Sequence, residues 1–400
     1  MRTAIAFLVM FVVVASGCQS DKPSAKPASG NEANLTQSEK SKIKTIGTLT
    51  PVVLFDKLPM PTGIAVSPSG RMFVNFPRWA DPVEYTVAEI KGGKAAPFPN
   101  LEINKLDESK AADRFVSVQS VVADSRDRLW VLDPASINFQ PVVPSGPKLV
   151  CIDLKSNEIV KKISFPSNVA LKTSYLNDVR FDFSRGSEGM AFITDSSGNG
   201  PNGIVVVDLA SGKSWRKLND HPTTKADRNF APHAEGKGSL MSRPPKGPPA
   251  FIKIGSDGIA IDPARKILYY RPLASHKLSS VSLDALADQN MSDTDVAKTV
   301  KDLGTLDYAS DGMECDSAGN LYLTDYEYNA IHVRSPGGQQ RVLVQNPALI
   351  WPDSMAIGTD QNLYVTANQL NRQKQFHEGE DQRKPPFVVF KTRALAGPQK

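Results

Sequence analysis

Short stretches of alternating apolar and polar residues recur along this chain, each followed by a turn and a second apolar stretch. The clearest copy spans residues 310–326, SDGMECDSAGNLYLTDY, in which Met313 and Cys315 alternate with acidic residues. Alternation with a period of two indicates a half-buried β-strand, and Gly319 can take the positive φ of a tight hairpin turn. We therefore predict a β-hairpin for this stretch.

The hairpin occurs six times, and further β-prone segments follow most copies. The six copies span residues 62–74, 118–132, 176–195, 256–270, 310–326 and 352–366. Strand repeats of ~40–50 residues are typical of a β-propeller, in which each repeat forms one four-stranded blade. The pattern therefore predicts an all-β fold, a six-bladed β-propeller. The last repeat ends with Phe387–Lys391 as its third strand, so we expect Pro51–Phe55 to supply the fourth strand and close the ring.

The first 44 residues differ in character from the repeats. Arg2 precedes an apolar run from Ala4 to Ala15, and Ala15-Ser16-Gly17-Cys18 resembles a bacterial lipobox. We interpret residues 1–18 as a signal peptide with a lipobox-like end that is lipidated at Cys18; an ordinary cleaved signal peptide is the alternative. Residues 19–44 have the composition of a flexible tether, and residues 45–400 form the propeller. The expected location is the cell envelope, lipid-anchored at the outer membrane or cell surface, or outside the cell after secretion.

Composition narrows the range of partners. Hydrophobic residues make up 40% of the chain and charged residues 22%, which is ordinary for a globular protein, and the net charge is +5. Because no stripe of Lys and Arg with interleaved aromatic residues occurs, we predict no nucleic-acid binding, membrane contact through the lipid anchor only, and a monomer. Cys151 and Cys315 lie in different repeats, and we expect two buried free thiols rather than a disulfide.

Strand direction predicts where a site would lie. In a propeller blade, the connections from the second to the third strand and from the fourth strand to the next blade emerge on one face, which we call the loop face. The long connections of this chain belong to that class and span residues 99–116, 134–147, 218–256 and 369–386. Long loops over one face of a rigid scaffold are where ligands usually bind, so we expect a small-molecule ligand there.

Polar residues open the predicted inner strands and would meet at the loop-face mouth of the central channel. They are Asn177, Asp178, Asp257, Asp311 and Asp353. Carboxylate and amide oxygens are the ligands that Ca²⁺ prefers, so Asn177, Asp257, Asp311 and Asp353 are candidate ligands of Ca²⁺ or another divalent cation. The alternative is that each Asp caps a turn at the start of its strand. The sequence makes no cofactor certain and assigns no catalytic residue.

A second set of polar residues ends the second strands on the same face: Asp133, Asp195, Asp325 and Asn368. We include Asp195, Asp325 and Asn368 among the candidate ligand-binding residues, although a turn that stops each strand is the simpler explanation. Four aromatic residues in adjoining loops are candidates for the walls of an apolar pocket: Phe139, Tyr326, Tyr328 and Trp351.

Two segments resemble the Yellow / major royal jelly protein family. They are PNGIVVVDLASGKSW at residues 201–215 and ILYYRPLASHKL at residues 267–278. The resemblance covers nearly the whole chain after residue 44 and implies a secreted six-bladed propeller. Members of that family include proteins linked to dopachrome conversion, binders of small aromatic amines, and nutritive proteins. The resemblance therefore bears more closely on the fold than on an activity.

The polar strand openings are also similar to those of the gluconolactonase / senescence-marker propellers, which hold a divalent metal with Glu, Asn and Asp side chains. This sequence departs from that pattern, because Thr62-Gly63 stand at the position of the Glu and Gln119 or Ser120 occupies the second blade. Three functions remain open: a binder of a small aromatic or amine ligand, an enzyme (a metal-dependent lactonase-type hydrolase or a dopachrome-type isomerase), and a protein-interaction scaffold. The sequence does not decide whether the chain is an enzyme.

Overall fold

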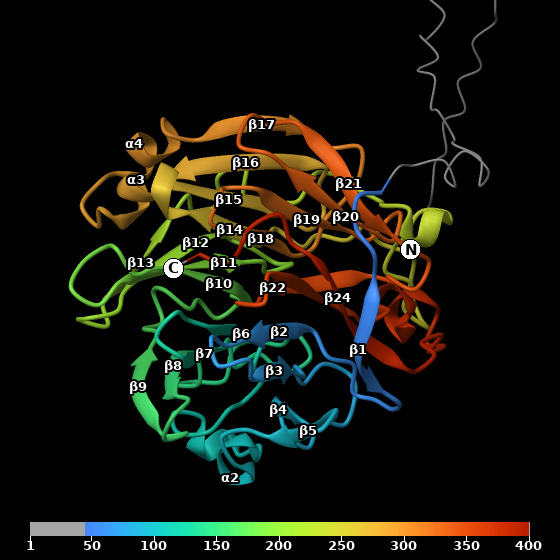
Figure 1. The fold of residues 1–400 in the computed structure, drawn as a ribbon, viewed down its shortest axis with the longest axis horizontal. Helices are drawn as coiled ribbons and strands as arrows, with labels where there is room; N and C mark the ends of the chain where they lie inside the picture. The colour runs from blue at the N-terminus through green and yellow to red at the C-terminus, as the bar shows by residue number, and fades with distance from the viewer. Residues whose placement is uncertain (1–44, 400) are drawn as a thin grey trace, which may run out of the picture. The chain divides into compact units, whose positions relative to one another are not determined.

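The computed structural model describes residues 45–399. The predictions for residues 1–18, for residues 19–44 and for lipidation of Cys18 therefore lie outside the described residues. Residues 45–399 contain 24 strands in six four-stranded antiparallel sheets, arranged around a channel as the blades of a β-propeller (Figure 1). The predicted all-β, six-bladed fold is confirmed.

The blades follow the chain in order. Blade 1 contains β2 (Gly63–Val66), β3 (Met72–Asn75), β4 (Val87–Lys91) and β5 (Lys94–Pro97). Blade 2 contains β6 (Ser120–Ala123), β7 (Arg128–Asp133), β8 (Lys148–Asp153) and β9 (Ile159–Ser164). Blade 3 contains β10 (Leu176–Asp182), β11 (Met190–Asp195), β12 (Gly203–Asp208) and β13 (Ser214–Lys217).

The second half of the ring repeats this plan. Blade 4 contains β14 (Ser256–Asp262), β15 (Ile267–Pro272), β16 (Lys277–Ser282) and β17 (Lys301–Thr305). Blade 5 contains β18 (Met313–Cys315), β19 (Leu321–Asp325), β20 (Ala330–Arg334) and β21 (Gln340–Gln345). Blade 6 contains β22 (Pro352–Ile357), β23 (Asn362–Ala367), β24 (Phe387–Arg393) and β1 (Thr50–Phe55).

The ring is closed by β1, as predicted. This strand pairs antiparallel with β24, with Thr50 opposite Lys391 and Phe55 opposite Phe387, and the two strands lie side by side in Figure 1. Val53 is buried in the core between blades 6 and 1, so the strand also contributes apolar surface. Blade 6 thereby gains its fourth strand from the opposite end of the described chain.

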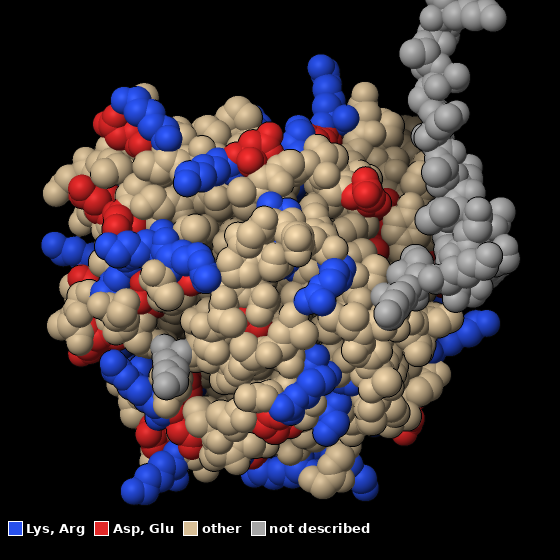
Figure 2. Space-filling model, turned by 45° about the horizontal axis from the view of Figure 1, so that its top comes forward, with Lys and Arg blue, Asp and Glu red and all other residues tan. Residues whose placement is uncertain are grey.

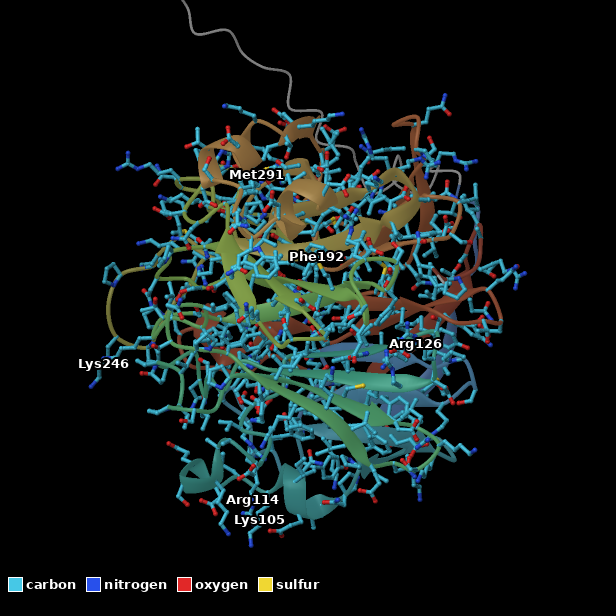
Figure 3. All side chains as sticks on the ribbon, turned by 90° about the vertical axis from the view of Figure 1, so that its left-hand side faces the viewer. Lys105, Arg114, Arg126, Phe192, Lys246 and Met291 are labelled. Atoms are coloured by element: carbon cyan, nitrogen blue, oxygen red, sulfur yellow. The ribbon has the colours of Figure 1, made fainter. Side chains whose placement is uncertain are left out.

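The first strand of each blade lines the channel, and the hydrophobic core lies between blades. Around the channel β2 contacts β6 and β22, β10 contacts β6 and β14, and β18 contacts β14 and β22. Phe192 is typical of the core: it is fully buried among side chains of blades 3 and 4 (Figure 3). Burial of such a ring stabilises the fold by about 1.5–3 kcal/mol.

Helices are short and lie in the connections. They are α2 (Leu101–Asn104), α3 (Leu283–Ala287) and α4 (Asp293–Ala297), with the 3₁₀ turns η1 (Glu108–Lys110), η2 (Ala234–Gly236), η3 (Pro263–Arg265), η4 (Leu370–Arg372) and η5 (Lys374–Phe376). Within residues 45–399, no helix has the length and apolar character needed to cross a bilayer. Basic and acidic side chains are interspersed over the face in Figure 2. Cys151 and Cys315 are buried free thiols, as predicted.

Candidate functional site

The first strands of three blades are irregular where the candidate residues lie. The register of β10 on β11 shifts between Leu176 and Val179, and similar shifts occur in β14 before Ile259 and in β22 before Met355. Such a shift interrupts strict alternation and re-aims the side chains inside it. The residues inside the three shifts are Asn177 and Asp178, Asp257 and Gly258, and Asp353 and Ser354.

Repeated threonines on the second strands bond to backbone groups at the openings of the first strands. The Thr194 hydroxyl donates to the carbonyl oxygen of Asp257 in the next blade at 2.6 Å. The Thr324 hydroxyl accepts the Asp311 amide at 3.0 Å, and the Thr366 hydroxyl donates to the Thr62 carbonyl oxygen at 2.8 Å. Because a buried unpaired backbone group is costly, these hydroxyls hold the strand openings in place.

Glycine after two of the aspartates lets neighbouring inner strands approach. A Cβ at Gly258 would lie 2.3 Å from the Asp311 carbonyl oxygen, and one at Gly312 would lie 2.2 Å from that of Asp353. Both distances are far shorter than a van der Waals contact, so any side chain here would push the strands apart. The Asp-Gly pairs therefore bring the carboxylates of Asp257, Asp311 and Asp353 close together at the channel mouth.

These carboxylates form the floor of a cavity of about 330 Å³ on the loop face, which we call the loop-face cavity. Gln119, Asn177, Asp257, Asp311 and Asp353 are all among its lining residues. Three of the predicted long connections, residues 134–147, 218–256 and 369–386, supply part of the remaining lining. The other lining residues come from shorter connections that were not singled out, such as Trp79 and residues 173–175 and 196–199. Four of the five residues predicted to open the inner strands thus line one cavity.

The floor carboxylates contact neutral donors. Asn177 Nδ2 donates to Asp257 Oδ1 at 2.7 Å, and Trp351 Nε1 donates to Asp311 Oδ2 at 2.7 Å. Asn368 Nδ2 donates to Asp353 Oδ2 at 2.6 Å. Among residues 45–399 no ion pair is formed by any of the three. The negative charge of the floor is therefore not balanced by a directly bonded cation of the described chain.

Burial and mutual repulsion hold protons on this floor. Burial, then the negative charges of Asp311, Asp178 and Asp353, raises the pKa of Asp257 well above its usual value. Burial likewise raises the pKa of Asp311 to about 6, against the effect of the Trp351 indole. The pKa of Asp353 is raised by burial and by the charge of Asp311. The contact between Asp257 and Asp311 raises the pKa of Asp257 and lowers the pKa of Asp311, which favours a shared proton on the Asp257 side.

A chain of hydrogen bonds runs from the cavity wall to this floor. The Trp79 indole N–H donates to the Tyr175 hydroxyl at 2.6 Å, and that hydroxyl donates to Gln119 Oε1 at 2.8 Å. Gln119 Nε2 then donates to Asn177 Oδ1 at 2.9 Å, and Asn177 donates to Asp257. Every donor in the chain points toward the carboxylates.

Aromatic rings form the wall above the floor. Phe139 stacks between Trp79, at a centroid distance of 5.2 Å, and Tyr175, at 4.9 Å. Phe251 and Phe376 line the opposite loops. Phe139 and Phe251 are 47% and 37% exposed, respectively, so apolar surface is available at the mouth of the cavity. An apolar wall over a charged floor suits an aromatic molecule that carries a cationic group.

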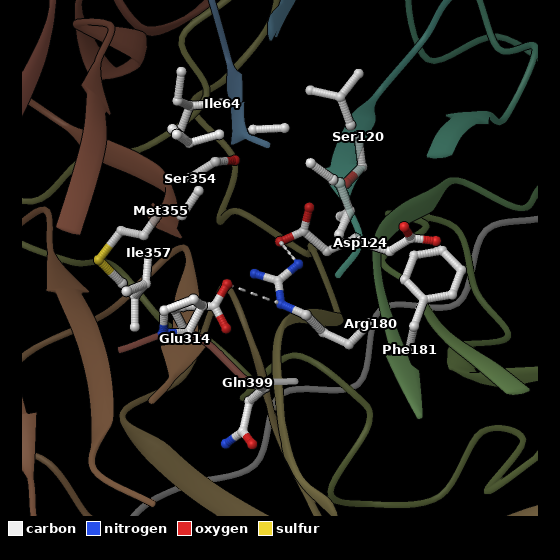
Figure 4. Close-up of a pocket in the computed structure, with 18 of the residues that line it drawn as sticks. Ile64, Ser120, Asp124, Arg180, Phe181, Glu314, Ser354, Met355, Ile357 and Gln399 are labelled. Carbon is white, nitrogen blue, oxygen red and sulfur yellow. Dashed lines mark ion pairs between the residues drawn. The ribbon is translucent and has the colours of Figure 1, made fainter. Parts of the chain in front are cut away.

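Asp178 is separated from its neighbour Asn177. It lines a second cavity of about 120 Å³ deeper in the channel, which we call the channel cavity (Figure 4). There Arg180 lies between Asp178, at 4.0 Å, and Glu314, at 3.6 Å, and donates to the Met313 carbonyl oxygen at 2.6 Å. Of the five residues predicted to open the inner strands, Asp178 is therefore the one placed away from the loop-face cavity.

The residues that end the second strands lie behind the wall. Asp195 accepts Arg216 at 2.7 Å and the Tyr175 amide at 2.9 Å, while Asp325 contacts His332 at 2.9 Å and caps the amides of the following turn. Neither lines the loop-face cavity, and Asn368 reaches it only through its bond to Asp353. Asp195, Asp325 and Asn368 each also accept the backbone amide of the residue two positions later, as expected of a turn that stops the strand.

The aromatic candidates divide in the same way. Phe139 lines the loop-face cavity, whereas Trp351 is buried and stacks on Tyr326 with a centroid distance of 4.1 Å. Three further residues of the cavity, Trp79, Tyr175 and Phe251, were not predicted from the sequence pattern. Tyr175 comes two residues before Asn177 and could have been noticed as part of a strand opening; Trp79 and Phe251 lie in loops without repeated pattern.

The floor does not fit a Ca²⁺ site as it is arranged. One oxygen of each floor carboxylate accepts an N–H group, and the Asn177 oxygen is bonded to Gln119 rather than facing the carboxylates. Ca²⁺ takes six to eight oxygen ligands, on the usual scale of about 2.3–2.6 Å. Within residues 45–399 there is no group of three or more His, Cys, Asp or Glu side chains placed to hold a metal ion.

Known proteins share this fold. A gluconolactonase from Xanthomonas campestris superposes with a TM-score of 0.50 at 11% identity, covering 87% of this chain and 89% of that one. At this identity the likeness concerns the fold alone.

Sequence relatives point to one family. Major royal jelly protein 3 of Apis mellifera is 27% identical over 224 residues, which are 54% of this chain and 38% of that protein. Dopaminechrome tautomerase of Drosophila melanogaster is 23% identical over 340 residues, which are 78% of this chain and 70% of that protein. The sequence profile of the family described as major royal jelly protein matches residues 116–395. On this match, the chain belongs to the major royal jelly protein family.

Proposed function

We propose that this chain binds a small aromatic amine in the loop-face cavity. The observation that carries the proposal is the group of three buried carboxylates, Asp257, Asp311 and Asp353, under a wall of aromatic rings. An ammonium group placed on the floor would offset the repulsion among the carboxylates. The ring of the same molecule would stack against Phe139 and its neighbours.

Size and charge support this ligand class. A volume of about 330 Å³ accommodates a molecule of one or two fused rings with a short side chain. The floor carboxylates form no ion pair within the described residues, so an ammonium group on the ligand would be their directly bonded cation. Lys253 lies among the lining residues and would disfavour a second cationic group at that position.

The binding test uses tryptamine with two matched probes, 3-ethylindole, which lacks the amine, and butylamine, which lacks the ring. All are titrated calorimetrically into the protein in EDTA. We expect tryptamine to bind at least tenfold more tightly than either probe. Equal affinity for tryptamine and 3-ethylindole would show that the floor carboxylates do not contribute to binding of the amine. No binding of any of the three compounds would refute the proposal.

A second candidate activity is isomerisation of a cyclised aminoquinone, and the Asp257–Asp311 pair favours it. The pair holds one proton, so one carboxylate can accept a carbon-bound proton while its partner gives the shared proton to a ring carbonyl oxygen. The pair then holds one proton again, and the product is an isomer of the substrate. The name of the Drosophila relative, a dopaminechrome tautomerase, is consistent with this chemistry.

Dopaminechrome and dopachrome test the second candidate. Their absorbance would decay faster with the protein than without it, and Asp257→Asn would abolish the acceleration. Binding without any acceleration would leave the chain a binder only. A lactonase-type activity is the weaker alternative, because that mechanism relies on a divalent cation and the floor does not fit one.

We also propose that the protein is exported and anchored through Cys18. The support is the sequence pattern of residues 1–18. In a bacterial host, Cys18→Ser should move the protein from the membrane fraction to the soluble fraction, or block processing of the precursor. Unchanged fractionation and mass would show that Cys18 carries no lipid.

A further inference from the structure

The loop-face cavity combines an acidic floor with a hydrogen-bond chain whose direction is fixed. The chain runs from Trp79 through Tyr175, Gln119 and Asn177 to Asp257. An indole N–H can donate but cannot accept, so the first link has only one direction. The Tyr175 hydroxyl therefore accepts a hydrogen bond from Trp79, and its one proton is available to donate to another acceptor.

That proton sets the orientation of both amides. Tyr175 is buried, and its hydroxyl donates to Gln119 Oε1, which turns the Gln119 amide nitrogen toward Asn177 Oδ1. Asn177 must then present its own nitrogen to Asp257. If the two amides were reversed, the Tyr175 hydroxyl would lose the one acceptor recorded for it within residues 45–399. A buried donor without an acceptor costs about 1–3 kcal/mol, so the observed direction is strongly preferred.

The direction of these hydrogen bonds determines which ligands the floor can bind. A divalent cation needs several oxygens turned toward one point, but here the Asn177 oxygen is directed away and its N–H group carries partial positive charge toward the floor. An organic ammonium group needs only acceptors, because it brings its own N–H donors. Each carboxylate oxygen has two lone pairs, and those that the donors described above leave open supply the acceptors.

We propose that Gln119 and Asn177 are specificity-determining residues that exclude divalent cations from an otherwise acidic floor. Exclusion follows from the hydrogen-bond chain and does not depend on the proposed amine ligand. It also makes a sharp prediction: replacing either amide by the isosteric carboxylate turns an N–H group into an oxygen and converts the floor into a Ca²⁺ site.

The test compares Asn177→Asp and Gln119→Glu with the wild-type protein. Asn199→Asp is the matched control, because it adds the same charge at the rim of the same cavity, and the Asn199 side chain takes no part in the chain of hydrogen bonds. Each protein is melted in EDTA and in saturating CaCl₂, and Ca²⁺ binding is measured by calorimetry. We expect Ca²⁺ to raise the Tm of the two floor variants and to bind them at least tenfold more tightly than wild type or Asn199→Asp.

Two results would overturn the proposal: stabilisation of the wild-type protein by Ca²⁺, or folded floor variants that do not respond to it. Circular dichroism establishes which variants are folded. If one floor variant does not fold, the other decides. If neither folds, the wild-type titration decides, since a wild-type response contradicts exclusion and its absence supports it. Failure of tryptamine to bind would leave this outcome unaffected, so the two proposals can fail separately.

Discussion

The two cavities of the channel carry similar acidic charge but balance it in different ways. In the channel cavity, Asp178 and Glu314 flank Arg180, whose guanidinium also bonds to the backbone across the channel (Figure 4). In the loop-face cavity, the side chains of residues 45–399 that donate to the three carboxylates are neutral. Consecutive residues of the same strands supply both cavities, as with Asn177 and Asp178.

This difference separates a structural site from a binding site. A charge cluster that contains its own counter-ion is complete, whereas a buried cluster without one is stable only when it takes up protons or an outside cation. We therefore expect changes to the channel cavity to affect folding and changes to the loop-face cavity to affect binding. Four predictions, in order of decreasing effect, test this contrast.

Loss of Arg180 should have the largest effect. Arg180→Met leaves Asp178 and Glu314 buried without their cation, which should lower the free energy of unfolding by about 3–5 kcal/mol. Urea denaturation at pH 8 measures the change. The double variant Arg180→Met/Glu314→Gln removes one of the stranded charges and should recover part of the loss. A single variant as stable as wild type would show that the channel cavity does not depend on its internal counter-ion.

Neutralising one floor carboxylate should act on binding instead. Asp311→Asn keeps an acceptor for Trp351 but removes a charge, so tryptamine affinity should fall about 30-fold or more, on the scale of a charged hydrogen bond. The apo fold should be as stable as wild type or slightly more stable. Asp325→Asn is the control: this carboxylate is buried but paired with His332 behind the wall, so its loss should destabilise the fold and leave the affinity unchanged. Loss of stability with unaltered binding in Asp311→Asn would refute the site.

The floor should also make the apo protein more stable in mild acid. Because the pKa of Asp311 is raised to about 6, the folded state binds a proton more tightly than the unfolded state does. Stability should therefore rise as the pH falls from 8 through 6 toward 5, by about 1.4 kcal/mol from this group. Denaturation at several pH values measures the slope, and Asp311→Asn should flatten it. If stability depended on pH in the same way in wild type and in Asp311→Asn, the raised pKa of Asp311 would be contradicted.

The smallest effect is expected at the rim. Phe139 is 47% exposed, so Phe139→Ala should change the stability of the fold little. It removes the ring that stacks between Trp79 and Tyr175, and tryptamine affinity should fall about five- to tenfold, or ~1 kcal/mol. Butylamine, which has no ring, should bind both proteins alike. A similar loss for both probes would assign the effect to a displaced loop rather than to stacking.

The fold could be predicted from the chain because each blade repeats one local pattern. Hairpin turns and period-two alternation are local features, and the absence of a fourth strand after Phe387–Lys391 indicated where Pro51–Phe55 had to pair. The meeting of Asn177, Asp257, Asp311 and Asp353 followed from their equivalent positions in the repeats. Equivalent positions in a ring of blades come together at one end of the channel.

The remaining features of the site depend on non-local geometry. The side chains of Asn177 and Asp178 line different cavities because the register of β10 shifts at these two residues. No residue type in the sequence indicates that shift. Asp195 forms an ion pair with Arg216 on β13. The fold of blade 3 brings these two residues together, and their spacing in the sequence does not predict it. Trp79 and Phe251 reach the cavity from loops without a repeated pattern, so their contribution appears only when the loops are placed over the floor.

The pairing of β1 with β24 has a consequence for synthesis of the chain. β1 is made near the beginning, but its partner β24 begins at Phe387, more than three hundred residues later. At roughly 5–20 residues per second, this strand waits on the order of 15–70 s before its partner emerges from the ribosome. A strand that remains unpaired for so long is open to wrong partners, so the growing chain depends on prolonged shielding of its first strand.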